Sequence, residues 1–361
     1  MSRYNYRRRL TREVSVGNTS IGGMNPIRLQ SMNNTSTLDT EGSALQAAKI
    51  AAAGGEIVRL TTQGEREAAN MENIGSRLRE LGCDVPLVAD VHFNPKAALK
   101  AAAVCDKVRI NPGNFADPGR VFRHLEYTDQ EYAEEIDKIR VRLRQLLDIC
   151  KEHHTALRLG VNHGSLSDRI MSRYGDTPEG MVESVMEYLR ICREEDFHQI
   201  VISIKASNVV VMVRTVRLLS QAMEEAGMDY PLHLGVTEAG DGEDGRVKSA
   251  CGIGTLLAEG LGDTIRVSLS EDPEKEIPVA RLLRDYITSR EGHAPIAEPG
   301  SDAPYPHRGS ASPFPAEWQI SDSQIPIAVG TDISAESLSS KAHICEATET
   351  PEIFEDTLPI V

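Results

Sequence analysis

The sequence predicts an α/β protein whose main body is a TIM (β/α)8 barrel, and three observations carry that prediction. Eight short runs rich in β-branched residues lie between turn residues, and helix-like stretches separate them. Strands that alternate with helices form parallel βαβ units, and eight such units close into a barrel of about 250 residues. Residues 1–290 contain 37 Lys and Arg against 42 Asp and Glu, whereas residues 291–361 contain 2 against 12 and also 9 of the 18 prolines. We therefore expect a barrel over residues 1–290 and a poorly structured, acidic extension over residues 291–361.

The expected elements follow in order along the chain. VSVGNTSIGG at residues 14–23 predicts an N-terminal hairpin with a Gly-Asn turn, which could close the N-terminal mouth of the barrel. The expected strands are residues 27–32, 57–61, 87–91, 107–111, 156–161, 199–206, 232–238 and 263–270. The expected helices are residues 41–53, 70–81, 95–103, 130–151, 178–194, 209–226 and 247–259. In the extension, residues 326–330 are the one strand candidate. The alternative is an open doubly wound sheet, but its first strand would lead into a glycine-rich turn, and here it leads into SMNNTST.

Composition excludes several classes of protein. The net charge of −15 argues against a nucleic-acid partner. No apolar run approaches the ~18 residues of a membrane helix, and the N-terminal arginines lead into polar residues instead of the apolar stretch of a secretory signal. The six cysteines form no C-x-x-C pair and are read as reduced thiols, so we predict no metal site and a cytoplasmic location.

Polar side chains gather at the carboxyl ends of the expected strands, where barrel enzymes place their active sites. A single arginine at a strand end is more often an ion-pair partner than a ligand. Five cations are harder to neutralise with the two nearby carboxylates, so an anion with several phosphate oxygens, such as a diphosphate, suits them better. The glycine-rich loop at residues 239–254 fits either a phosphate site or a flexible surface loop, and both interpretations stay open. The residues concerned are Arg59, Asp90, His92, Arg109, Asn111, Arg158, Asn162, His163, Lys205, Asn208, Glu238, Arg266 and Ser268.

The segments that carry these residues resemble the 4-hydroxy-3-methylbut-2-enyl diphosphate synthase (GcpE/IspG) family. The runs PIRLQSMNNTSTLDT, LVADVHFNPKAALKAA, DKVRINPGN, LRLGVNHGSLSDRI and LHLGVTEAGDGEDGRVKSACGIG span the barrel, and FADPGRVFRHLEYTDQEYAEEI is similar to the three-domain branch. The resemblance implies an oxidoreductase of non-mevalonate isoprenoid biosynthesis, which reduces 2-C-methyl-D-erythritol 2,4-cyclodiphosphate with electrons from ferredoxin or flavodoxin. It implies Glu238, Asp90 and His92 as catalytic residues. It implies substrate contacts by Arg59, Arg109, Asn111, Arg158, Asn162, Lys205, Arg266 and Ser268.

One departure from the family concerns its [4Fe-4S] cluster. The family binds that cluster with three cysteines and a glutamate in a C-terminal domain, but here no C-x-x-C pair exists and Cys345 is the one cysteine beyond residue 290. We expect residues 291–361 to be a proline-rich linker and the start of a truncated inserted domain, so that the chain binds cyclodiphosphate but does not reduce it alone. A fragment, a split enzyme and a degenerate enzyme stay open. Two other functions also stay open: a pterin-binding barrel like dihydropteroate synthase, and an inactive diphosphate-binding module.

Overall fold

A computed structural model of the chain describes residues 5–116, 126–240 and 242–297, together with three short strands beyond them. Eight parallel strands form one sheet in the order β8-β7-β6-β5-β4-β3-β10-β9, and a parallel bridge between Ile202 and Leu232 joins the two ends. The sheet is therefore closed, which confirms the predicted barrel and excludes the open sheet. The eight strands are β3 (Arg28–Met32), β4 (Ile57–Thr62), β5 (Leu87–Val91), β6 (Lys107–Ile110), β7 (Ala156–Asn162), β8 (Ile200–Lys205), β9 (His233–Leu234) and β10 (Thr264–Ile265).

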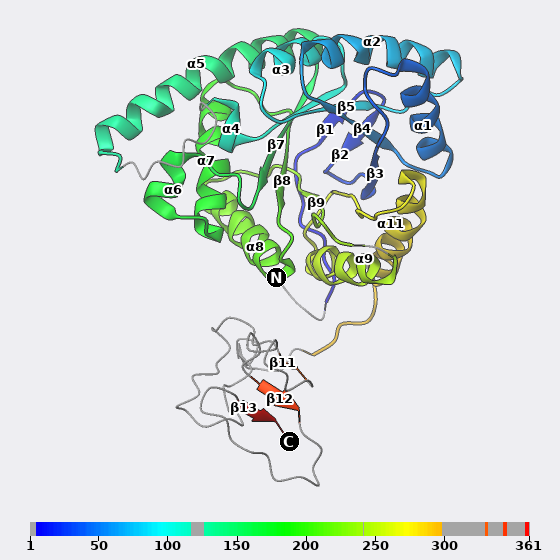
Figure 1. The fold of residues 1–361 in the computed structure, drawn as a ribbon, viewed down its shortest axis with the longest axis vertical. Helices are drawn as coiled ribbons and strands as arrows, with labels where there is room; N and C mark the ends of the chain where they lie inside the picture. Colours follow the sequence, from blue (N-terminus) through cyan, green and yellow to red (C-terminus); the bar gives the residue numbers. More distant parts are fainter. Residues whose placement is uncertain are drawn as a thin grey trace. The chain divides into compact units, whose positions relative to one another are not determined.

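Helices surround the strands, as Figure 1 shows. All seven expected helices are present, although α2 begins five residues before its expected start. The helices are α1 (Thr40–Ala52), α2 (Glu65–Glu80), α3 (Pro95–Ala102), α4 (Pro112–Phe115), α5 (Asp129–His153), α6 (Asp168–Tyr174), α7 (Pro178–Glu194), α8 (Val209–Glu225), α9 (Gly242–Ser249), α10 (Thr255–Ala258) and α11 (Pro273–Thr288), with a π-helical turn at Ala250–Gly254. Asparagine or threonine side chains cap α3, α5, α7 and α8, so the start of each helix is encoded locally.

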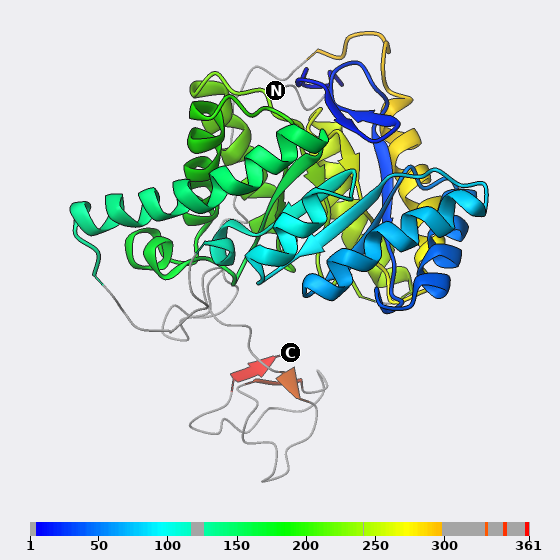
Figure 2. The same ribbon diagram turned by 90° about the horizontal axis from the view of Figure 1, so that it is seen from above.

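The hairpin β1 (Val14–Val16) and β2 (Thr19–Ile21) lies at one end of the barrel (Figure 2). Its two-residue turn begins at Gly17, whose φ of +56° is one that a tight hairpin turn requires and that glycine adopts freely. Val14, Val16 and Ile21 are fully buried and form one cluster with inward-facing residues at the beginnings of four barrel strands. The hairpin therefore closes the N-terminal mouth with an apolar floor, as the sequence predicted, and leaves the carboxyl ends of the strands for function.

Residues Ala297–Val361 form a second compact unit, separate from the unit Met1–Ile296. Its described part is three paired parallel strands, β11 (Val329–Gly330), β12 (Ala342–Ile344) and β13 (Leu358–Ile360). Strand β11 falls within the single strand candidate of residues 326–330. The other residues of the predicted acidic extension lie outside the described residues, so the boundary at residue 290 and the truncated-domain assignment stay predictions. No helix among the described residues has the length and apolarity that crossing a membrane requires.

Candidate active site

The register of the strands directs a row of ionisable side chains toward the interior of the barrel. Laterally paired residues of parallel strands share a face, and the pairs Asp90–Arg109 and Arg109–Arg158 therefore point the same way. All three side chains are almost fully buried. An interior of this kind differs from the apolar layers that usually fill such a barrel. The ionisable side chains inside it are Arg59, Asp90, Lys107, Arg109, Arg158, Lys205, His233 and Arg266.

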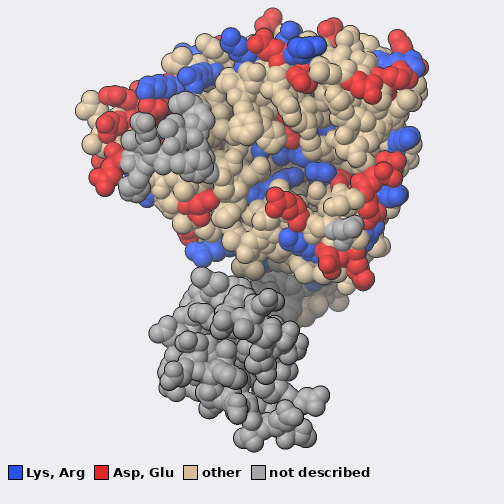
Figure 3. Space-filling view, viewed as in Figure 1, with Lys and Arg blue, Asp and Glu red and all other residues tan. Residues whose placement is uncertain are grey.

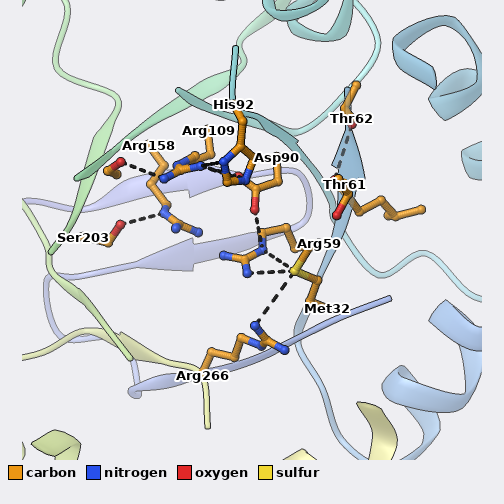
Figure 4. A network of polar contacts seen from close by, with 12 residues as sticks. Met32, Arg59, Thr61, Thr62, Asp90, His92, Arg109, Arg158, Ser203 and Arg266 are labelled. Carbon is orange, nitrogen blue, oxygen red and sulfur yellow. Dashed lines mark hydrogen bonds and ion pairs between the residues drawn. The ribbon is translucent and has the colours of Figure 1, made fainter. Parts of the chain in front are cut away.

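Asp90, on β5, is the centre of the polar network in Figure 4. Its Oδ2 lies 3.1 Å from Nε of Arg59, and its Oδ1 lies 3.1 Å from Nη1 of Arg109. The same Arg109 nitrogen lies 3.0 Å from Nε2 of His92, so two of the predicted catalytic residues, Asp90 and His92, lie together with the predicted substrate contact Arg109. Burial alone would raise the pKa of Asp90, but the two guanidinium groups hold it well below the usual range. Asp90 is therefore a fixed anion in this structure.

Arg158 and Lys205 make no ion pair among the described residues. Arg158 donates from Nε to Oγ of Ser203 at 2.9 Å, while its Nη1 is buried without a partner. Burial lowers the pKa of Arg158 and Lys205 well below their ordinary values, and the neighbouring cation Arg59 lowers both further. Desolvated cations without counter-charges are costly, so this arrangement favours an anionic ligand.

Two inward-facing glycines leave space for the side chains of Arg109 and Lys205. A Cβ atom at Gly160 would lie 2.5 Å from Nε of Arg109, and one at Gly235 would lie 3.0 Å from Nζ of Lys205. Neither position therefore tolerates a side chain without displacing a cation. These glycines lie in the runs LRLGVN and LHLGVT. Their positions in the sequence alone do not indicate that they make room for the side chains of Arg109 and Lys205.

Arg266 has a partner that the sequence did not indicate. Its Nη2 donates to Oε1 of Glu276 at 2.9 Å, and this carboxylate of α11 also accepts from Oγ of Ser31 at 2.6 Å. Glu276 is 1% exposed. The sequence interpretation counted Asp90 and Glu238 as the two nearby carboxylates and judged them too few for five cations; the structure adds Glu276 as a buried counter-charge of Arg266. Five inward cations toward the carboxyl ends of the strands (Arg59, Arg109, Arg158, Lys205 and Arg266) therefore face two buried carboxylates, a surplus of three positive charges.

Glu238 lies beyond β9 with an exposed side chain and a φ of +52°. A glutamate in the left-handed region is uncommon, and such strain is concentrated at functional sites. Its carbonyl oxygen accepts from Nζ of Lys248 at 3.1 Å, which ties the strand end to α9. Its carboxylate makes no hydrogen bond or ion pair within the described part of the chain, so it is free to meet a ligand.

The remaining predicted residues are placed less directly. Asn111 is 1% exposed and caps α4 by accepting from the N–H of Gly113 at 3.1 Å, while its Nδ2 donates to Ser165. Its side chain therefore shapes the rim rather than pointing freely at a ligand. Asn162 pairs with Lys205 at the ends of β7 and β8, and Ser268 is half-buried beyond β10. His163 lies 3.8 Å from Asp176, away from the Asp90 network.

A cavity of about 680 Å³ opens beside this network. It is lined by Met32, Arg266 and Glu276, by Asn33 and Asn34 after β3, and by Leu269, Ser270, Glu271, Asp272, Pro273 and Lys275 after β10. The sulfur of Met32 lies 2.8 Å from Nη2 of Arg59 and 3.9 Å from Nη1 of Arg266, so the cavity reaches the cationic interior. Figure 3 shows Lys and Arg side chains near the centre of the face that it draws, with Asp or Glu side chains beside them. The cavity is large enough for a small phosphorylated molecule. Its own charged lining residues are Arg266, Lys275, Glu271, Asp272 and Glu276, so the excess of positive charge lies beside it, in the interior of the barrel.

The loop after β9 keeps both of its predicted interpretations open. Gly240, Gly242 and Gly245 have the spacing of a dinucleotide fingerprint, which the sequence interpretation overlooked, and they open α9. Such a fingerprint functions in an open sheet, and this sheet is closed. The pair Arg246–Glu271, whose nearest atoms are 2.5 Å apart, links this loop to the one after β10.

The described residues do not fit a [4Fe-4S] cluster. Among them, no group of three His, Cys, Asp or Glu side chains is close enough to bind a metal ion. Cys105, Cys150 and Cys192 are buried as separate thiols, and Cys251 is exposed. Cys345 lies outside the described residues. No step of the reaction is therefore assigned to a cluster bound by the described residues.

Comparison with known proteins identifies the family. Residues 11–281 match the GcpE TIM-barrel domain. The chain is 69% identical over 304 residues to the 4-hydroxy-3-methylbut-2-en-1-yl diphosphate synthase (flavodoxin) of Phocaeicola vulgatus, covering 84% of this chain and 49% of that protein. It is 54% identical over 307 residues to the enzyme of the same name from Akkermansia muciniphila, covering 84% and 52%. The chain thus spans about half the length of these relatives.

Solved structures show a shared fold alone. N-acetylneuraminic acid synthetase from Leptospira borgpetersenii matches 81% of this chain and 95% of its own, with a TM-score of 0.51 and 10% identity. Dihydropteroate synthase from Xanthomonas albilineans matches 78% and 100%, with a TM-score of 0.50 and 12% identity. Neither similarity supports a shared activity at such identities. The family match over residues 11–281 and the close relatives agree, and the chain belongs to the GcpE TIM-barrel family.

Proposed function

We propose that this chain is the substrate-binding barrel of a 4-hydroxy-3-methylbut-2-enyl diphosphate synthase and that its mouth binds 2-C-methyl-D-erythritol 2,4-cyclodiphosphate. The observation that carries the proposal is the surplus of three inward positive charges toward the carboxyl ends of the strands, where five cations face the carboxylates of Asp90 and Glu276. The cyclic diphosphate has one negative charge on each phosphorus, and its compact ring suits the neighbouring cavity of about 680 Å³. The names of the close relatives support the same substrate class.

The reaction makes the ligand more negative. Two electrons and one proton convert the cyclic dianion into the open allylic diphosphate, a trianion, and one water, with cleavage of the ester bond that closes the ring and loss of the tertiary hydroxyl. The added charge develops on the diphosphate oxygen that the ring opening frees. A site with excess positive charge therefore stabilises the opened diphosphate more than the cyclic one, which is the difference that accelerates a reaction.

The roles of the residues follow from their placement. Arg158 and Lys205 have no counter-charge and are proposed to bind the phosphates directly, with Arg59, Arg109 and Arg266 around them. Asn162 and Ser268 would contribute neutral hydrogen bonds at the rim, and Asn111 would hold that rim through its cap. Asp90 and His92 would orient the arginines. Glu238, whose carboxylate is unengaged among the described residues, is proposed to deliver the one proton with which the tertiary hydroxyl leaves as water.

The electrons come from outside the described residues. The names of the relatives carry the word flavodoxin, so a flavodoxin, or a ferredoxin of similar potential, is proposed as the donor of the complete enzyme. The family implies a [4Fe-4S] cluster, which another part of the protein or another chain would have to supply. We propose a cytoplasmic location, where such donors and the diphosphate substrate occur together.

Isothermal titration calorimetry with cyclodiphosphate tests the substrate assignment. Arg158→Ala and Lys205→Ala should each weaken binding by about 1.5–3 kcal/mol, because each removes charged hydrogen bonds to phosphate. Arg214→Ala, which removes an exposed guanidinium paired with Glu179 on the outer surface, is the matched control and should bind like the unmodified chain. Unchanged affinity in both site variants would contradict the proposal, as would tighter binding of a pterin diphosphate.

A further inference from the structure

The lower half of the barrel contains polar groups that the proposed site does not use. Lys107 is the first residue of β6, and its Cα pairs with Val88 on one side and Ala156 on the other. Both of those side chains belong to the apolar floor that the hairpin closes. Because paired residues share a face, the Lys107 side chain also points inward at floor level, and it is 0% exposed.

Several buried polar atoms at this level have no partner. Nζ of Lys107, Nη1 of Arg158, both ring nitrogens of His233 and Oε1 of Gln30 make no hydrogen bond within the described residues. Gln30 connects to the same level through its Nε2, which donates to Thr264, the residue paired with His233. Native interiors rarely leave so many polar atoms unsatisfied together, and an unpaired buried ammonium is among the costliest of them.

The charges that face Lys107 are mostly positive. Its neighbour Asp106 is the nearest acidic side chain along the chain, but that carboxylate accepts from the N–H of Leu87 outside the barrel interior. The hairpin packs against the floor with Val14, Val16 and Ile21, which carry no charge. The charged or titratable groups that face the interior from the strands around Lys107 are Arg59, Asp90, Arg109, Arg158, Lys205, His233 and Arg266.

We propose that Lys107 is a positioning residue of the diphosphate site: its amine is neutral in the empty barrel and takes up one proton from solvent when an anion fills the mouth. This inference rests on the proposed function. Lys107 is thus positively charged only when an anion is bound, and the empty barrel does not contain this further buried cation. Lys107 does not touch the ligand and acts through Arg158 and Arg59.

The electrostatics support this linkage. Burial lowers the pKa of Lys107 well below its ordinary value, and Arg158 and Arg59 lower it further. A dianion bound to those two arginines opposes their effect on Lys107, so the pKa of the amine rises when the site is filled. By linkage, binding that is coupled to protonation weakens as the pH rises, and one coupled proton changes the dissociation constant about tenfold per pH unit.

Calorimetry with cyclodiphosphate at pH 7.5, in buffers of different ionisation enthalpy such as Pipes and Tris, counts the protons taken up. The unmodified chain should take up about one proton more than Lys107→Met, and its dissociation constant should rise more steeply with pH by up to about tenfold per unit. Lys107→Gln, a polar substitution, should behave like Lys107→Met. Lys100→Met, which alters an exposed lysine of α3, should behave like the unmodified chain.

The outcomes separate the two proposals. Equal proton uptake by the unmodified chain and both Lys107 variants would overturn the inference while leaving the substrate assignment intact. No binding by the unmodified chain would overturn the substrate assignment and the inference together. Without any ligand, Lys107→Met should unfold at a higher urea concentration at pH 7.5, with a gain that shrinks as the pH approaches about 10.4, because the unfolded lysine binds a proton that the folded one lacks. A variant that is less stable at pH 7.5 would count against a neutral, unpaired amine.

Discussion

Replacing Asp90 by asparagine should destabilise the barrel more than any single surface change. Asp90 is 3% exposed and is the counter-charge of two guanidinium groups, those of Arg59 and Arg109, that are 6% and 1% exposed. The amide has no charge, and its NH2 group would face an arginine donor. Removing one partner of a buried ion pair costs about 3–5 kcal/mol, and the loss here should lie toward the upper value because two cations are left unpaired.

Urea denaturation at pH 7, followed by circular dichroism, measures this loss. Asp137→Asn is the matched control, since its pair with Arg140 on α5 is exposed and should contribute less than about 1 kcal/mol. The pH dependence has a definite sign. The folded-state pKa of Asp90 lies below its unfolded value of about 3.9, so its contribution is present above that pH and is lost as the pH falls toward the folded-state pKa. An Asp90→Asn protein as stable as the unmodified chain at pH 7, or a stability difference that widens on acidification, would refute the reasoning.

Four further variants test other features of the fold. Glu276→Gln should cost about 3 kcal/mol in urea denaturation, because Arg266 loses its buried counter-charge. Ile21→Ala should lower the free energy of unfolding by about 2–5 kcal/mol without changing cyclodiphosphate affinity in calorimetry, since Ile21 is a floor residue with 0% exposure. Tyr188→Phe should cost about 1 kcal/mol by leaving the carbonyl of Pro112 without its 3.1 Å hydrogen bond, as a melting curve would show. Glu238→Gly should raise the melting temperature slightly, because glycine adopts a φ of +52° without the backbone strain that a glutamate has there. The same change should abolish turnover when the complete enzyme is assayed with its electron donor.

The positions of the cations could be predicted from the sequence because parallel strands place their carboxyl ends at one face. Arg59, Arg109 and Arg158 each follow the alternation of a strand, so their convergence depends on a pattern that is local in the sequence. The counter-charge Glu276 could not be predicted in this way, since it lies on a helix after the last strand and nothing in that helix marks one glutamate as buried. Side-chain pairing between distant elements is set by packing, which periodicity does not encode.

The same limit explains why the buried polar groups at the level of the floor could not be predicted. Lys107 stands at the beginning of a strand, and a lysine is seldom fully buried, but here its side chain is 0% exposed beside the apolar floor that the hairpin closes. His233 reads in the sequence as one residue of an ordinary strand, but the register places it inside. Periodicity also gave no sign that the Asn111 side chain caps α4, and its predicted contact with the ligand stays a prediction.

The N-terminal segment also constrains the order in which the chain folds. Arg8 pairs with Asp263, 255 residues away, and the N–H of Arg9 donates to the carbonyl of Gly260. The hairpin floor likewise requires Val201. During synthesis the N-terminal residues therefore leave the ribosome long before Val201, Gly260 and Asp263 have been made. Until then the apolar side chains of Val14 and Val16 stay exposed to solvent. Contacts of such sequence separation slow folding and expose the waiting segment to chaperones and to aggregation. The floor of the barrel is therefore completed late in folding.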